Sequence, residues 1–228
     1  MTMPLHCELD HLVVGARTLA EGVAWCESAL GVMPGPGGRH DFMGTHNRLL
    51  PLSSPRFPRC YLEIIAIDPD AAPPAQPRWF DLDRADFTSG PRLLHLVARN
   101  ADLASARAAL CALDLDPGPP TAASRETAGG RLRWDITVTG DGRLRLGGAL
   151  PTLIHWQGAH PTESMPAAGL ALQRLELRGW PSPLQAVLAL AGIELAPARA
   201  GEPGGLSACL QTPGGTVWLH ASVPGAAA

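Results

Sequence analysis

Four polar side chains interrupt otherwise apolar segments, and their types are those that bind divalent metals or transfer protons. His11 lies in LDHLVV and His95 in LLHLVA, whereas Glu63 lies in YLEIIAI and His155 in TLIHWQG. Within each pair of segments the polar residue has the same register. Burying an unpaired carboxylate is costly, so Glu63 requires a cation, a hydrogen-bond network or a metal. Imidazoles beside a carboxylate are typical ligands of Zn²⁺, Fe²⁺, Mn²⁺ or Ni²⁺, which makes these residues candidates for a metal site.

A structural role is the alternative for each of these residues. A single His in a buried strand commonly donates a hydrogen bond to a neighbouring carbonyl. A buried Glu is more often paired with Arg than with a metal, and Arg is plentiful in this chain. Equivalent positions in two repeats favour the metal, because four ligands would converge if the two copies packed around a pseudo-two-fold axis.

Repeated successions of strands and helices would position these residues. The first copy comprises a strand at 9–14, a helix at 18–32, strand-like residues at 39–52 and a strand at 60–67. The second comprises a strand at 92–99, a helix at 101–115, strand-like residues at 131–140 and a strand at 150–156. The third comprises a strand at 170–179, a helix at 181–193 and a hairpin of 206–212 with 216–221. Apolar residues near every 3.6 positions indicate the helices, and runs of β-forming residues indicate the strands.

This order predicts an α+β fold with open curved sheets, built from two βαβββ modules and a truncated third module. We expect the modules at residues 5–68, 90–158 and 168–222. Arg174 stands where a third His is expected and His220 where a third Glu is expected, so the third module should lack a metal and cap the others. No G-x-G-x-x-G follows a strand, so a dinucleotide-binding fold has no support.

Composition excludes several functional classes. The chain has no Lys, which excludes a Walker A loop and Schiff-base chemistry. A net charge of −3 gives no indication of nucleic-acid or membrane binding. The five cysteines are widely spaced, which favours free thiols in the cytosol over a disulfide framework. With no signal peptide apparent at the N-terminus, a cytoplasmic location is expected.

Three segments resemble the glyoxalase-like branch of the vicinal oxygen chelate superfamily: HLVVGARTLAEGVAWCESALGV, GGRHDFMGTHNRLL and YLEIIAIDP. The resemblance is strongest over residues 10–68 and extends more loosely to about 157. In that superfamily two βαβββ modules form a U-shaped, open barrel around a divalent metal. By position, the resemblance implies His11, Glu63, His95 and His155 as its ligands. The last of these is usually Glu or another oxygen ligand, so water could replace it, or His155 could act as a base beside a metal with three ligands.

The segment 37–47, GGRHDFMGTHN, is the second feature shared with this superfamily. Its polar residues are candidates for binding substrate near the pocket mouth: His40, Thr45, His46 and Asn47. The alternative is a polar hairpin that bends at Gly44. Three tryptophans are candidates for lining an apolar pocket, although each could equally be core: Trp79, Trp134 and Trp156.

The resemblance implies a metal-dependent enzyme, a lyase, isomerase or dioxygenase, acting on a small carbonyl or enediol-forming substrate. Glu63 is the first candidate for the catalytic base and His155 the second. The alternative is a non-catalytic protein that sequesters a small molecule, as bleomycin-resistance relatives do. That alternative predicts an internal hydrogen-bonded pair of His11 and Glu63. By analogy with the superfamily, a homodimer is the assembly that the resemblance suggests.

Overall fold

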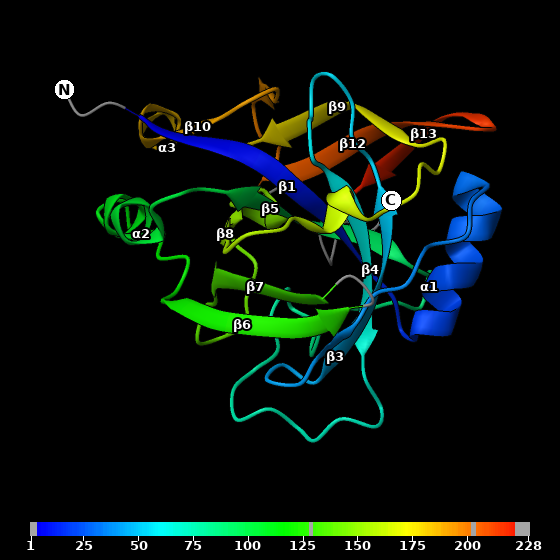
Figure 1. The fold of residues 1–228 in the computed structure, drawn as a ribbon. Helices are drawn as coiled ribbons and strands as arrows, with labels where there is room; N and C mark the ends of the chain where they lie inside the picture. The colour runs from blue at the N-terminus through cyan, green and yellow to red at the C-terminus, as the bar shows by residue number, and fades with distance from the viewer. Residues whose placement is uncertain (1–3, 128–129, 202–203, 222–228) are drawn as a thin grey trace.

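The computed structural model describes residues 4–127, 130–201 and 204–221 (Figure 1). The first module contains β1 (Leu5–Gly15), α1 (Leu19–Trp25), β2 (Arg39–His40), β3 (Thr45–Pro51) and β4 (Tyr61–Ile67). The second contains β5 (Arg92–Arg99), α2 (Leu103–Cys111), β6 (Pro120–Thr127), β7 (Gly130–Thr137) and β8 (Thr152–Trp156). The C-terminal part contains β9 (Ala171–Arg178), α3 (Ser182–Val187), β10 (Leu188–Leu190), β11 (Glu194–Ala196), β12 (Gly205–Thr212) and β13 (Gly215–His220).

The two βαβββ modules share one strongly curved sheet. Its strands follow the order β2-β3-β4-β1-β5-β8-β7-β6, so the second module repeats the first about an axis between β1 and β5. Strands β1 and β5 are antiparallel, while β1–β4 and β5–β8 are parallel pairs. In the described part of the chain no pairing joins the edge strands β2 and β6, so the barrel stays open. The predicted α+β fold with a curved open barrel is confirmed.

The predicted repeat elements are present, with two local differences. The helix expected at 181–193 ends at Val187, and the chain continues as β10, which pairs in parallel with the start of β1. The alternation of VLAL suits this edge, because Leu188 and Leu190 are buried there. Strand β6 was not expected, since its sequence PTAASRET contains no large apolar residue. The last position of the predicted third module, residue 222, lies outside the described residues.

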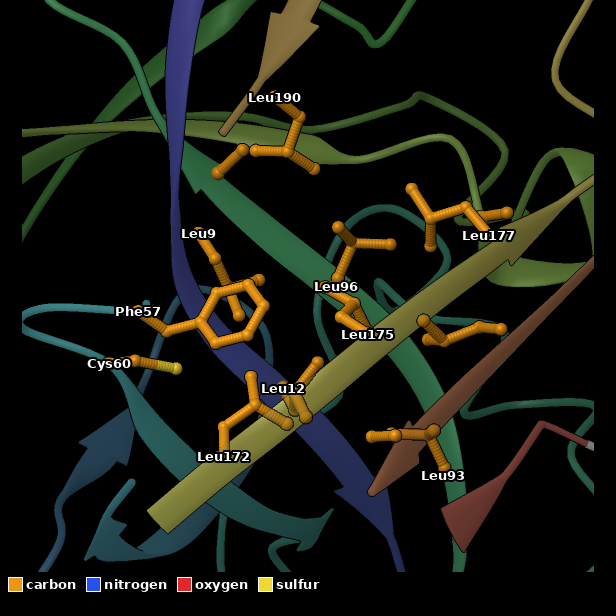
Figure 2. Close-up of a cluster of buried hydrophobic side chains, with 14 of the residues drawn as sticks. Leu9, Leu12, Phe57, Cys60, Leu93, Leu96, Leu172, Leu175, Leu177 and Leu190 are labelled. Atoms are coloured by element: carbon orange, nitrogen blue, oxygen red, sulfur yellow. The ribbon is translucent and has the colours of Figure 1, made fainter. Parts of the chain in front are cut away.

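A second sheet, of order β11-β9-β12-β13, covers the outer face of β1 and β5 (Figure 1). Leucines from both sheets form a single buried cluster between them, as Figure 2 shows for Leu12, Leu96, Leu172 and Leu175. The concave inner face of the barrel carries a separate, aromatic-rich cluster. The C-terminal part is therefore packed into the fold through its leucines rather than attached as an independent domain.

The described residues contain no helix long and apolar enough to cross a membrane. All five cysteines are free thiols, as expected from their spacing.

We predict that the barrel and the C-terminal sheet unfold together. Leu175→Ala should lower the free energy of unfolding by about 2–5 kcal/mol, because Leu175 is completely buried between the sheets. Leu195→Ala, at a 44% exposed position, is the control and should change it by less than about 0.5 kcal/mol. Urea unfolding followed by circular dichroism and tryptophan fluorescence should give coincident transitions. An early, separate transition of the C-terminal sheet would contradict this expectation.

Candidate functional site

Two β-bulges, one in β1 and one in β5, turn consecutive side chains toward the barrel interior. On β1 the register with β5 shifts between Leu9 and His11, so Asp10 is the extra residue. A bulge interrupts the alternation of side chains, and Asp10 and His11 therefore lie together. On β5 the second shift makes Leu94 the extra residue beside His95. Both modules thus have a β-bulge in their first strand, but the extra residue is polar only in the first module, where it is Asp10.

Asp10 is completely buried and accepts hydrogen bonds from four side chains. His11 Nδ1 lies 2.6 Å from Oδ1, while Oδ2 accepts from Trp156 Nε1 at 2.9 Å, His160 Nε2 at 3.0 Å and Arg99 Nη1 at 3.2 Å. Burial opposes ionisation of Asp10, but the hydrogen bonds from His11 and His160 outweigh it and hold the pKa well below its usual range. Asp10 is therefore a carboxylate that ties β1 to β5, to β8 and to the segment after β8.

His11 and Glu63 form an internal pair on the inner face. The Nε2 of His11 lies 3.5 Å from Oε2 of Glu63, and the imidazole stacks on Tyr61 at 4.5 Å between ring centroids. Burial disfavours the imidazolium, but hydrogen bonding to Asp10 and Glu63 outweighs it and raises the pKa of His11 to about 9. Burial likewise opposes ionisation of Glu63, whereas His11 lowers the pKa of that carboxyl to about 2. At neutral pH the pair is an imidazolium and a carboxylate.

A chain of neutral groups continues from Glu63 along β3 and β2. Asn47 donates from Nδ2 to Oε1 of Glu63 at 2.6 Å, and its own Oδ1 accepts from the amide of Gly38 at 2.8 Å. His40 lies 3.4 Å from Asn47 Nδ2 through Nε2 and 3.1 Å from Thr45 Oγ1 through Nδ1. Burial lowers the pKa of His40 to about 4, so the ring is neutral. Three of the four residues predicted to bind substrate are thus gathered beside Glu63.

The fourth of those residues, His46, lies on the other face of β3. Its Nδ1 is 4.0 Å from Asp68 Oδ2, and burial lowers its pKa. Because side chains alternate along a strand, His46 points away from Thr45 and Asn47.

His95 occupies the position equivalent to His11 but has different partners. Its Nδ1 donates to the carbonyl of Gly148 at 2.9 Å. Its Nε2 accepts from the amide of Thr152 at 3.1 Å and contacts Thr152 Oγ1 at 3.0 Å. Burial lowers the pKa of His95 to about 3, so this ring is neutral. Both ring nitrogens are therefore already occupied by hydrogen bonds.

Strand register makes Thr152, not His155, the equivalent of Glu63. Val13 on β1 pairs with Glu63 on β4, and Val97 on β5 pairs with Thr152 on β8. Val13 and Val97 are related by the axis between the modules, because each lies opposite the histidine of the other strand. The expected equivalence of Glu63 and His155 is therefore wrong by three residues.

His155 lies on the outer face of β8. Ile154 and Trp156 line the interior, so the intervening side chain points the other way, where its strand partner is Asp135. Neither polar residue noted in the third module lies in the barrel. Arg174 pairs with Glu194, and His220 contacts Ser207.

The His11–Glu63 pair faces a cavity of about 30 Å³, which has room for one or two water-sized groups. Aromatic rings form much of its wall: Tyr61, Trp79, Phe80, Trp134 and Trp156. The three tryptophans expected to line an apolar pocket or to belong to the core do both, since all three line this cavity and Trp79 and Trp134 are also buried members of the inner cluster. Trp79 and Phe80 belong to the segment between the modules and stack at 5.1 Å, and Phe80 also contacts the ring of His95 at 5.2 Å. Phe80 has a φ of 59°, which is unusual for a bulky residue.

Three further residues of the site were not anticipated from the sequence: Asp10, Arg125 and His160. Asp10 directly precedes His11, whereas the aligned residue in the second repeat is Leu94. This difference in the sequence could have indicated that Asp10 belongs to the site. Arg125 and His160 lie in segments without a motif, and only the fold brings them to the barrel.

The described residues do not fit the predicted four-ligand metal centre. His11 and Glu63 lie within reach of a shared ion, and Asp10 orients His11 as an outer carboxylate does in metal sites. His95, however, uses both nitrogens within its own module, and His155 lies on the opposite strand face. No group of three or more His, Cys, Asp and Glu side chains in the described ranges is arranged to hold a metal.

Comparison with known proteins gives one extended match. The family model described as a glyoxalase-like domain matches residues 9–191. No curated protein matches the chain.

Several solved structures are similar to this chain at low sequence identity. A hypothetical protein from Staphylococcus aureus superimposes with a TM-score of 0.50 and 13% identity, over 75% of this chain and 69% of the other. Methylmalonyl-CoA epimerase from Mycobacterium tuberculosis gives a TM-score of 0.38 and 17% identity, over 69% and 91%. A variant of the Streptomyces coelicolor methylmalonyl-CoA epimerase in complex with 2-nitronate-propionyl-CoA gives 0.40 and 13%, over 69% and 100%. At such identities the likeness concerns the fold alone.

We predict a stability maximum near pH 6.5. The pKa of His11 is raised from 6.5 to about 9, so its stabilisation is complete below pH 6.5 and is lost as the pH rises toward 9, by up to about 3 kcal/mol. His40 and His95 have lowered pKa values, so they favour unfolding as the pH falls below 6.5. Urea midpoints measured between about pH 4.5 and 8 should show both slopes; above that range the buried thiols of Cys7, Cys26 and Cys60, whose pKa values burial raises, add an alkaline slope of their own. His11→Gln should remove the alkaline slope, and His155→Gln should keep it; an alkaline slope that survives in His11→Gln would contradict the assignment.

We further predict that Zn²⁺, Fe²⁺, Mn²⁺ and Ni²⁺ stabilise the protein no more than they stabilise its Glu63→Gln variant. A metal bound at a hundred times its Kd would contribute about 2.7 kcal/mol and raise the melting temperature by roughly 5–10 °C. Thermal unfolding with each metal and with chelator measures the difference. A saturable rise in the wild type that is lost in both His11→Gln and Glu63→Gln would instead establish a metal at this pair.

Proposed function

We propose that this chain, which belongs to the glyoxalase-like domain family of the vicinal oxygen chelate superfamily, is an enzyme. The proposed reaction moves a proton at the carbon atom next to a carbonyl group. The substrate class is a small carbonyl compound that can form an enol. The observation that supports the proposal is a geometric one: His11 Nε2 and Glu63 Oε2 lie 3.5 Å apart, and both buried side chains line the cavity. An isomerase or a lyase is the reaction type that this pair serves.

In the proposed reaction His11 is the acid and Glu63 the base. A carbonyl oxygen that enters the cavity accepts the Nε2 proton of His11, while Glu63 removes a proton from the adjacent carbon. The electron pair of the broken C–H bond forms the carbon–carbon double bond of an enol. Return of the two protons regenerates the carbonyl, with the carbon-bound proton on the other face or at another position in an isomerisation.

The surroundings of the pair suit these roles. Asp10 holds the Nδ1 side of His11 and favours the imidazolium that acts as the acid. The low pKa of Glu63 depends on His11, so a substrate oxygen that takes over the imidazolium N–H allows the pKa of Glu63 to rise. Asn47 keeps one carboxylate oxygen fixed, which directs the other toward the cavity. His40, Thr45 and Asn47 remain the proposed substrate-binding groups.

The proposal contains no step through a metal, because two of the four predicted ligands are directed elsewhere. It also assigns no role to His155, which lies on the outer face of β8. Pairing of two chains as a homodimer stays a prediction.

A non-catalytic binding protein is the second candidate. The internal pair of His11 and Glu63 is the arrangement that this alternative predicts, and the aromatic walls suit an apolar ligand. The two candidates differ in whether a bound carbonyl compound exchanges its protons.

Proton exchange in D₂O tests the enzymatic proposal. Small ketones, 2-oxo acids and acyl thioesters would be followed by proton NMR, and at least one class should exchange protons next to its carbonyl. Glu63→Gln should reduce that exchange at least about 100-fold, because a positioned general base contributes that much. The control is Glu194→Gln in the C-terminal sheet, where this carboxylate pairs with Arg56 and Arg174 and does not line the cavity.

Exchange in no class, or equal exchange in Glu63→Gln, would overturn the proposal. Compounds that raise the melting temperature without exchanging their protons would support the binding protein instead.

A further inference from the structure

A groove of about 460 Å³ lies at the barrel mouth, next to the buried cavity. Its wall comes from both modules, with Leu49 of β3 and Leu132 of β7 among the lining residues, and from the segment after β8 that contains Met165. Met33 also lines the groove, with 67% of its surface exposed. A cavity of this size with apolar walls is typical of a site for a small organic molecule.

Arg125 lines both the groove and the buried cavity. It is the only charged side chain among the described residues that line the groove. No hydrogen bond or ion pair joins Arg125 to another residue of the described ranges, whereas its hairpin neighbour Arg131 pairs with Glu126. The guanidinium is therefore free to bind an acceptor supplied by a ligand.

The backbone beside Arg125 leaves room for this guanidinium. A Cβ on Gly38 would lie 2.6 Å from Nη1 of Arg125, so a side chain at this position would displace the guanidinium from its observed place. The positive charge also acts on the site: burial is the main cause of the low pKa of His40, and Arg125 lowers it further.

The internal charges behind Arg125 balance one another. Among the buried groups, the carboxylates Asp10 and Glu63 face Arg99 and the His11 imidazolium, and Arg99 also pairs with Glu8, which is exposed to solvent. Arg125 thus adds a positive charge that no acidic residue of the groove neutralises. An anion is the complementary ligand group, and a carboxylate fits a guanidinium best because two parallel hydrogen bonds can form.

We propose that the groove binds the apolar body of a carboxylic acid and that Arg125 binds its carboxylate at the boundary with the buried cavity. The inference rests on the proposed function and narrows its substrate to carbonyl compounds that carry a carboxylate and an apolar body. Arg125 is then a specificity residue, which selects the substrate and takes no part in proton transfer.

Binding of octanoate and octanol, measured by isothermal titration calorimetry, tests the proposal with two probes of equal chain length. The wild type should bind octanoate at least about tenfold more tightly than octanol, because only octanoate offers a charge-assisted acceptor. Arg125→Gln should remove this preference and leave octanol binding unchanged. Arg131→Gln, on the same hairpin but outside the groove, should keep it. Leu132→Asp should weaken both probes if the apolar body lies in the groove.

Equal affinities for the two probes in the wild type, or a preference that survives in Arg125→Gln, would overturn the proposal. Its failure is distinguishable from failure of the enzymatic proposal, because Glu63→Gln should retain the octanoate preference. Proton exchange without an octanoate preference refutes only the carboxylate site. An octanoate preference without exchange refutes only the enzyme.

Discussion

A carboxylate removed from water must be surrounded by hydrogen-bond donors. For Asp10 these donors come from several elements, whose positions relative to one another it therefore fixes. Its four donors come from β1, β5, β8 and the segment that follows β8. Moving any of these elements would take one donor away from a buried charge, and removing a partner from such a charge is strongly destabilising. Asp10 also favours the charged form of His11. The same carboxylate therefore links the two modules and determines the charge of a residue on the inner face of the barrel.

The modules show how one backbone can support two electrostatic environments. Both first strands carry a bulge and a histidine in equivalent places. In the first module Asp10 and Glu63 flank the histidine, and it is an imidazolium. In the second the equivalent residues are Leu94 and Thr152, and the histidine is neutral. Two side-chain differences therefore separate a charged centre from a structural one, and the pseudo-symmetry of the fold does not extend to its polar interior.

The sequence was sufficient for the repeat and for half of the site. Polar residues that interrupt runs of apolar residues identified His11, Glu63 and His95, because such an interruption is visible within a single segment. The position of His155 was misjudged because the segments YLEIIAI and TLIHWQG were aligned on their own residue patterns, whereas the equivalence is set by the pairing of β4 with β1 and of β8 with β5. The contacts of Arg125 and His160 with the interior depend on curvature of the sheet, and the bulge at Asp10 depends on pairing with β5. These are long-range properties that no single segment encodes.

Because of the leucine interface between the two sheets, the segment that folds as one unit is longer than the domain that the family model matches. The family match ends at residue 191, yet β12 and β13 continue the buried cluster to Ala221. A chain shortened to its recognisable domain would present Leu12 and Leu96 to water as part of a wide apolar surface. Such surfaces drive aggregation. Any expression of a shortened form therefore has to retain the C-terminal sheet, although sequence similarity gives no reason to keep it.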